Sequence, residues 1–117
     1  MNIVLISNLD YNFSAKISKI CNDNDDNIFF CDSLNELATK QISDSLVVVD
    51  YDDSFKNIDK ILNISKKLSK VTFCIIMKDV NSSIQKKLTN YGYDLVMSKQ
   101  SFLINFSTIK KQFLLKK

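Results

Sequence analysis

Short apolar runs alternate along the chain with segments whose apolar residues recur at helical spacing. The apolar runs predict strands at 3–6, 26–33, 46–50, 71–77 and 94–98. The helical spacing predicts helices at 13–23, 34–41, 55–69, 81–92 and 102–117. The chain is therefore expected to repeat a strand followed by a helix five times.

Local signals support several of these elements. Ser33 and Glu36 have the spacing of a capping box at the start of helix 34–41. Gly92, the only glycine, ends helix 81–92. The segment LVVVD (46–50) has no alternation of apolar and polar residues, which is typical of a central parallel strand that is covered on both faces.

Alternating strands and helices with short connections are typical of a parallel sheet with right-handed crossovers. We therefore predict one domain over residues 1–117 with an α/β fold, a doubly wound five-stranded parallel sheet with helices on both faces. The strands are expected to end at Ile6, Phe30, Val49, Met77 and Ser98.

Cysteine and histidine usage narrows the class of protein. The three cysteines form no CxxC pair and His is absent, so the sequence gives no basis for a disulfide framework or a zinc site. The N-terminus lacks the basic region and cleavage site of a signal peptide, and no apolar run is long enough to span a bilayer. A soluble cytoplasmic protein with reduced thiols and no membrane partner is expected.

Charge is distributed unevenly between the two halves of the chain. Residues 1–59 carry 11 acidic residues and 4 lysines, whereas residues 60–117 carry 12 lysines and 2 acidic residues. Arginine is absent, although it makes most bidentate contacts to bases and phosphates. The lysine-rich half also has no recognisable recognition helix, so direct binding of nucleic acid by this domain is not expected.

The carboxyl ends of the predicted strands contain the candidate site, because ligands of open α/β sheets bind beyond those ends. The residues at these ends are Ser7, Asn8, Cys31, Asp32, Asp50, Met77, Lys78, Ser98 and Lys99. A cofactor site of the flavin or dinucleotide type is not expected, because the segment after the first strand, SNLDYN, contains no glycine.

Two segments resemble the receiver domain of bacterial response regulators. SLVVVD (45–50) is similar to the third strand of that family, which ends in the phosphoacceptor aspartate, and GYDLVMSK (92–99) is similar to its fifth strand and the lysine that ends it. The resemblance covers the whole chain and implies a flavodoxin-like receiver fold. It places Asp50 at the phosphoacceptor position and Lys99 at the lysine position.

The family's remaining site residues are replaced in this chain. Receivers hold a magnesium ion with two acids at the end of the first strand, where this chain has Ser7 and Asn8. They have a hydroxyl residue at the end of the fourth strand, where this chain has Met77 and Lys78. Since a hard dication is normally held by carboxylates, the resemblance implies a degenerate phosphorylation site with no metal and no cofactor.

The residues that the family uses for signal readout also differ. Val96 stands at the place of the aromatic residue in the fifth strand that changes rotamer, and Gln100 follows Lys99 where receivers have a proline. The usual phosphorylation-dependent readout is therefore not expected.

The acids near the strand ends are expected to have structural roles. Asp10 is expected to be a turn residue, and Asp52 and Asp53 are expected to be loop acids or charges at a helix N-terminus. Asp50 and Lys99, from neighbouring strand ends, are expected to form an ion pair that needs no phosphate. A residual phosphoacceptor and an unpaired Asp50 are the alternatives.

The predicted function is that of an atypical response-regulator receiver-like domain, a phosphorylation-independent protein interaction or regulatory module in signal transduction, and not an enzyme. The alternative is a functional receiver of a two-component system that is phosphorylated on Asp50, which would need Mg²⁺. The predicted partner is a protein or an output domain. The resemblance also implies possible homodimerisation, because receivers commonly pair through the face that corresponds to segments 81–92, 94–98 and 102–117. The last helix carries more apolar residues than one core stripe needs, which is consistent with an exposed apolar flank. The alternative is that these residues cover the sheet and pack against the first helix.

Overall fold

The computed structural model describes residues 2–7, 10–31, 45–54 and 71–115. The predicted helices at 34–41 and 55–69 lie outside these residues. A short helix, α3 (Tyr51–Ser54), directly follows the third strand. Asn8, Asp32 and the capping box at Ser33 and Glu36 also lie outside them.

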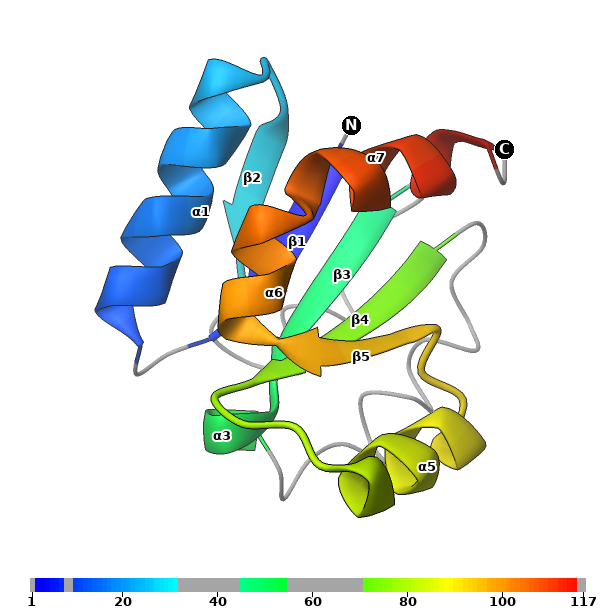
Figure 1. Ribbon diagram of the computed structural model, residues 1–117. Coiled ribbons are helices and arrows are strands. Elements are labelled where there is room, and N and C mark those ends of the chain that lie inside the picture. Colours follow the sequence, from blue (N-terminus) through cyan, green and yellow to red (C-terminus); the bar gives the residue numbers. More distant parts are fainter. Residues whose placement is uncertain (1, 8–9, 32–44, 55–70, 116–117) are drawn as a thin grey trace.

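Five strands form one parallel sheet (Figure 1). They are β1 (Asn2–Ile6), β2 (Asn27–Phe30), β3 (Ser45–Asp50), β4 (Val71–Met77) and β5 (Leu95–Ser98). Their order across the sheet is β2-β1-β3-β4-β5, so β3 is central and β2 and β5 are at the edges. The predicted strand ends are confirmed, with β3 ending one residue later than expected.

Two of the predicted helices are present within two residues of the expected limits and have recognisable ends. α1 (Tyr11–Asp23) begins after Asp10, whose side chain accepts a hydrogen bond from the Phe13 backbone N–H. α5 (Ser82–Tyr91) begins after Asn81, whose side chain accepts from the Ile84 backbone N–H. It ends at Gly92, which has a φ of 116°. Glycine suits this position because a left-handed conformation is strained for other residues.

The prediction of one closing helix over 102–117 is wrong. The structure has two helices, α6 (Lys99–Ile104) and α7 (Phe106–Leu115). Asn105 separates them, and both its backbone N–H and its side-chain amide donate to the Ser101 carbonyl oxygen at 2.9 Å. Asparagine side chains compete in this way for backbone groups and favour helix ends. Of the described helices, none has the combination of length and apolar character needed to cross a bilayer.

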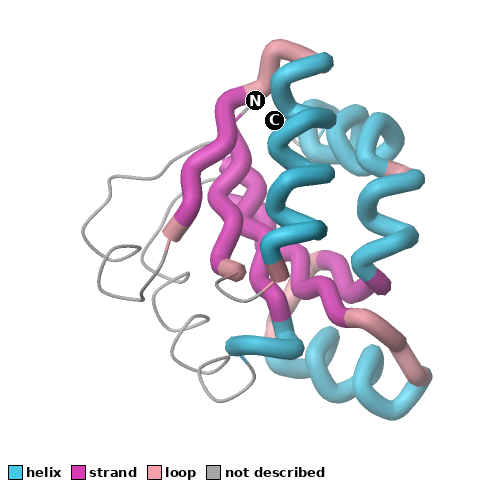
Figure 2. Tube along the Cα trace, turned by 90° about the vertical axis from the view of Figure 1, so that its left-hand side faces the viewer, coloured by secondary structure: helices cyan, strands magenta, loops and turns pink. Residues whose placement is uncertain are grey.

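Alternate residues of the strands pack into two apolar clusters, one on each side of the sheet. One cluster joins Ile3, Leu5 and Leu46 of the strands to α1, α6 and α7, which Figures 1 and 2 place on the same side of the sheet. The other cluster joins Val4 and Val47 to residues that include Leu88 of α5. Every residue of β3 is buried, as expected for a central strand. Because two predicted helices lie outside the described residues, helices on both faces remain a prediction.

Candidate functional site

Asp50 and Lys99 meet at the carboxyl edge of the sheet. Asp50 is the last residue of β3 and is 1% exposed, and Lys99 is the first residue of α6. Lys99 Nζ lies 2.9 Å from Asp50 Oδ2, so the predicted contact is present. The expectation that their strands are neighbours is wrong, because β4 lies between β3 and β5. The lysine side chain extends past the end of β4 to reach the aspartate.

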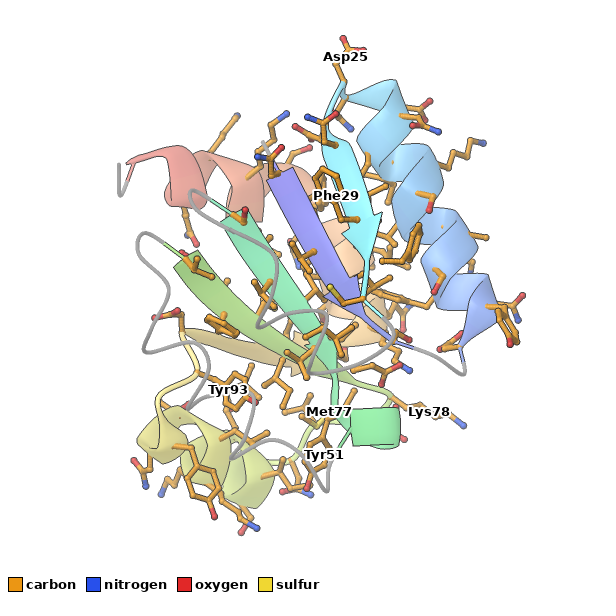
Figure 3. The ribbon with its side chains drawn as sticks, turned by 180° about the vertical axis from the view of Figure 1, so that it is seen from behind. Asp25, Phe29, Tyr51, Met77, Lys78 and Tyr93 are labelled. Carbon is orange, nitrogen blue, oxygen red and sulfur yellow. The ribbon has the colours of Figure 1, made fainter. Side chains whose placement is uncertain are left out.

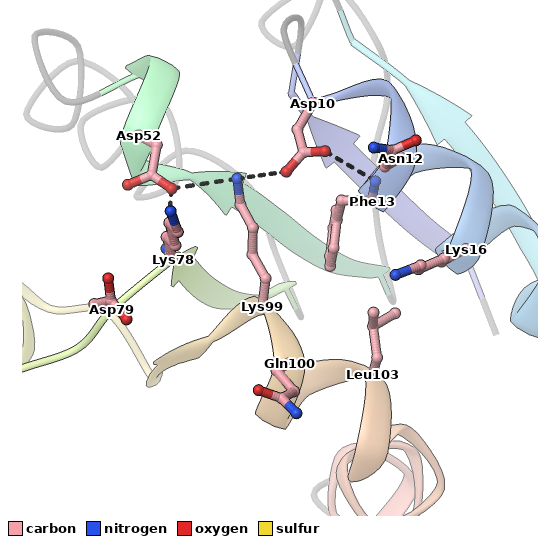
Figure 4. Close-up of a pocket in the computed structure, with 10 residues that line it drawn as sticks. All are labelled: Asp10, Asn12, Phe13, Lys16, Asp52, Lys78, Asp79, Lys99, Gln100 and Leu103. Atoms are coloured by element: carbon pink, nitrogen blue, oxygen red, sulfur yellow. Dashed lines mark hydrogen bonds and ion pairs between the residues drawn. The ribbon is translucent and has the colours of Figure 1, made fainter.

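Two further carboxylates contact the same ammonium group (Figure 4). Lys99 Nζ lies 2.9 Å from Asp10 Oδ2 and 3.3 Å from Asp52 Oδ2. Asp10 was expected to be a turn residue and Asp52 a loop or helix-terminal acid, and neither expectation included a contact with Lys99. Asp10, Asp50, Asp52 and Lys99 together are called the lysine cluster below.

Each of the two additional acids is held in place by a backbone N–H group. Asp10 Oδ1 accepts a hydrogen bond from the Phe13 N–H at 3.0 Å, which is the N-cap contact of α1. Asp52 Oδ2 accepts from the Lys78 N–H at 2.9 Å, which connects α3 to the segment after β4. The position of Asp10 directly before an amphipathic helix was a sequence signal for its role as an N-cap. No signal in the sequence indicated its contact with Lys99.

The two oxygens of Asp50 have further partners inside the protein. Ser7 Oγ donates to Oδ2 at 2.9 Å, and the Asp52 backbone N–H donates to Oδ1 at 3.0 Å. Ser7, at one of the positions where receivers have an acid, therefore lies in the site and supports Asp50. The other such position, Asn8, lies outside the described residues.

Met77 and Lys78 do not contribute side chains to the lysine cluster. Met77 is 1% exposed and belongs to the apolar cluster against which Tyr51 packs (Figure 3). The Lys78 side chain is exposed and points away from the sheet in the same view. Only the Lys78 backbone N–H contacts the cluster, through Asp52. The end of β4 thus provides an apolar side chain and a backbone donor.

A cavity of about 730 Å³ opens beside the lysine cluster (Figure 4). Asp10, Asp52 and Lys99 line it, together with Phe13 and Leu103 as apolar neighbours. Asp50 is not among the lining residues. The carboxylate that the resemblance designates as a phosphoacceptor is therefore separated from this cavity by the residues that surround it.

The contacts between these groups shift two pKa values. Burial lowers the pKa of Lys99, but hydrogen bonds to Asp10 and Asp50 outweigh that effect and hold the pKa above the usual 10.5. The hydrogen bond from the Phe13 N–H and the bond from Lys99 hold the pKa of Asp10 below its usual 3.8. Lys99 and Asp10 therefore both remain charged over a wide range of pH.

The three aspartates of the lysine cluster could offer a metal ion hard carboxylate oxygens, which would suit Mg²⁺ if the lysine were absent. With Lys99 Nζ within 3.3 Å of all three carboxylates, a dication would have to displace it. Within the described part of the chain, no group of three or more His, Cys, Asp or Glu side chains has an arrangement that could hold a metal ion. The site as built does not fit magnesium.

No protein-family model matches this chain, and no curated protein matches it. The site consists of a buried aspartate and two partly exposed aspartates around one lysine.

Proposed function

We propose that the chain is an atypical receiver-like domain, with the doubly wound flavodoxin-like arrangement and helices on both faces. It acts in the cytoplasm as a phosphorylation-independent interaction or regulatory module in signal transduction, and it is not an enzyme. Its partner is another protein or an output domain. Homodimerisation through the face of α5, β5 and the closing helices belongs to the same proposal.

The observation that carries this proposal is the position of the Lys99 ammonium group among three carboxylates. Phosphoryl transfer depends on positioning and on neutralising the charge of the phosphoryl oxygens, which a bound dication normally does. Here the local cation is a covalently attached lysine that is already shared by Asp10, Asp50 and Asp52. The charge of Lys99 is therefore already neutralised by carboxylates, although Lys16 and Lys78 also line the adjacent cavity.

The burial of Asp50 supports the same proposal. Its carboxylate is 1% exposed, and its two oxygens accept bonds from Ser7, Lys99 and the Asp52 N–H. Attack on a phosphodonor would require one oxygen to lose these bonds and become accessible. The geometry favours a structural carboxylate that joins β3 to α6.

One observation favours the alternative, a functional receiver of a two-component system. Asp10 and Asp52 supply the additional carboxylates that the sequence alone did not place near Asp50, and their side chains are 33% and 43% exposed. Binding of Mg²⁺ would require Lys99 to move away and the three carboxylates to rearrange, because no group of the described residues is arranged to hold a metal ion. Phosphorylation of Asp50 would then be feasible.

The two functions differ in their response to a small phosphodonor. The chain is incubated with acetyl phosphate, with and without Mg²⁺, and its intact mass is measured; beryllofluoride serves as a second probe. The proposal predicts no adduct. A magnesium-dependent gain of one phosphoryl group that disappears in Asp50→Asn, but persists in the exposed control Asp23→Asn outside the cavity, would overturn it.

A further inference from the structure

Among the strands that the structure describes, β2 has a partner on one side only. It lies at the end of the strand order and pairs only with β1. The Cys31 N–H donates to the Leu5 carbonyl oxygen at 2.9 Å, so Cys31 directs its backbone groups toward β1. Because these directions alternate along a parallel strand, Ile28 and Phe30 direct their N–H and C=O groups outward. These are the groups through which another strand can add to a sheet.

The side chains of β2 do not protect this side. Edge strands are usually blocked by lysine, proline or a bulge, and the sequence of β2, NIFF, contains no charged residue and no proline. Phe30 is 44% exposed, and Phe29 is exposed on the same strand (Figure 3). Exposed aromatic residues on an edge that no other described strand covers favour the addition of an extended segment.

Charge indicates what kind of segment fits. Residues 20–31 contain three aspartates and no lysine. Asp26 pairs with Lys110, whereas two other aspartates are exposed: Asp23, the last residue of α1, and Asp25, in the turn that leads into β2. A cationic side chain at the corresponding end of an added strand would neutralise this turn. The β2 strand of a second copy has no cation, so self-pairing would leave these charges uncompensated.

We infer that the outer edge of β2 is a docking site for an extended segment of a partner protein, with apolar residues along Phe30 and a Lys or Arg beside Asp23 and Asp25. Main-chain hydrogen bonds to Ile28 and Phe30 supply the pairing, as in other cases of strand addition. This inference rests on the proposed interaction module and names its docking surface.

A random decapeptide display library, selected on the full 117-residue chain, tests the inference. Enriched peptides are synthesised, their affinities are measured, and amide hydrogen exchange locates the bound segment. Phe30→Pro removes an outward donor but no bond to β1, and the matched control Phe30→Thr keeps the donor. Asp23→Asn combined with Asp25→Asn removes the two exposed charges without altering β2.

We expect enriched peptides that carry Lys or Arg and protect the amides of Ile28 and Phe30. Phe30→Pro should weaken binding about tenfold or more, and the double Asp variant should weaken it severalfold at low salt. If Phe30→Pro does not fold, the inference is still tested by the protection of the Ile28 and Phe30 amides and by the affinity of the double Asp variant.

Absence of enrichment, protection of other amides, or enrichment of acidic peptides would overturn the inference. Self-association through β2, detected by sedimentation and lost in Phe30→Pro, would replace the partner with a second copy and also overturn it. A phosphoryl adduct on Asp50 would refute the proposed function by a separate readout, while leaving the peptide result unchanged.

Discussion

Lys99 Nζ lies 2.9 Å from Asp50 Oδ2 although the strands that carry or precede these residues are separated by β4. Two strand spacings of about 4.8 Å lie between β3 and β5. The contact is possible because β4 ends at Met77 and the chain then leaves the sheet. The long lysine side chain crosses the carboxyl end of β4, so one ion pair connects the central strand to the closing helices.

Replacement of Lys99 by methionine should lower the free energy of unfolding by about 3 kcal/mol. Methionine has an unbranched stem similar to the apolar part of lysine but removes the ammonium group from the buried Asp50 carboxylate, and removing one partner of a buried ion pair is strongly destabilising. Urea unfolding followed by circular dichroism measures the change. Adding Asp50→Asn to this variant should recover part of the loss.

The control for this prediction is Lys78→Met, because Lys78 is exposed and contacts the lysine cluster only through its backbone. This variant should stay within about 0.5 kcal/mol of the wild-type protein. Equal urea midpoints for Lys99→Met and Lys78→Met would show that the lysine cluster does not contribute to stability.

The lowered pKa of Asp10 predicts how the contribution of this residue to the free energy of unfolding depends on pH. Because this pKa is lowered in the folded state, the contribution of Asp10 is present above its usual value of 3.8 and is lost as pH falls through the lower folded value. Asp10→Asn retains a good N-cap and removes only the charge. It should cost less than about 1 kcal/mol at neutral pH, since the side chain is 33% exposed and solvent screens its charge.

The measurement is the difference in unfolding free energy between the wild-type protein and Asp10→Asn as a function of pH. This difference should be constant through the neutral range and should shrink below pH 3.8. A difference that grows in acid would contradict the assigned direction of the shift.

The sheet could be predicted from the sequence because each strand is a short apolar run bounded by polar residues. LVVVD (46–50) predicted a central strand, and all residues of β3 are buried. The break at Asn105 was missed because the apolar spacing continues through it. The hydrogen bonds to the Ser101 carbonyl oxygen that end α6 depend on a local conformation that periodicity does not report.

The site could be predicted only in part. The topology predicted a set of strand-end residues at one edge of the sheet, and the resemblance to receivers singled out Asp50 and Lys99 among them. The contacts of Asp10 and Asp52 with Lys99 depend on how the connections after β1 and β3 fold back. The conformation of these connections depends on the N-cap contact of Asp10 and on the contact of Asp52 with the distant Lys78 N–H. The positions of the two aspartates in the sequence do not predict these contacts.

A second ion pair should stabilise the opposite end of the sheet. Lys110 Nζ of α7 lies 3.0 Å from Asp26 Oδ1, and the Asp26 side chain is 1% exposed. Lys110→Met should lower the free energy of unfolding by about 2–3 kcal/mol, because a buried carboxylate loses its cation. Lys111→Met, which changes an exposed lysine of the same helix, should have little effect. Thermal unfolding of both variants would refute the prediction if their midpoints were equal.

The cysteines should be unreactive while the protein is folded. Cys21, Cys31 and Cys74 are all buried. Burial, and then the charge of Asp94, raise the pKa of the Cys74 thiol to about 12, and burial, with the charge of Asp26, raises that of Cys21 to about 11. Since the thiolate is the nucleophile, little of it exists at pH 8 in the native state, and burial also blocks access.

Iodoacetamide at pH 8, followed by intact mass, should therefore show no modified cysteine in the native protein and three in denaturing urea. Native labelling should proceed only as fast as the protein opens, so Lys99→Met, which lowers stability, should speed it, whereas Lys78→Met should not. Rapid modification of the wild-type protein at one cysteine would show that this thiol is accessible, and would contradict the burial on which the raised pKa depends.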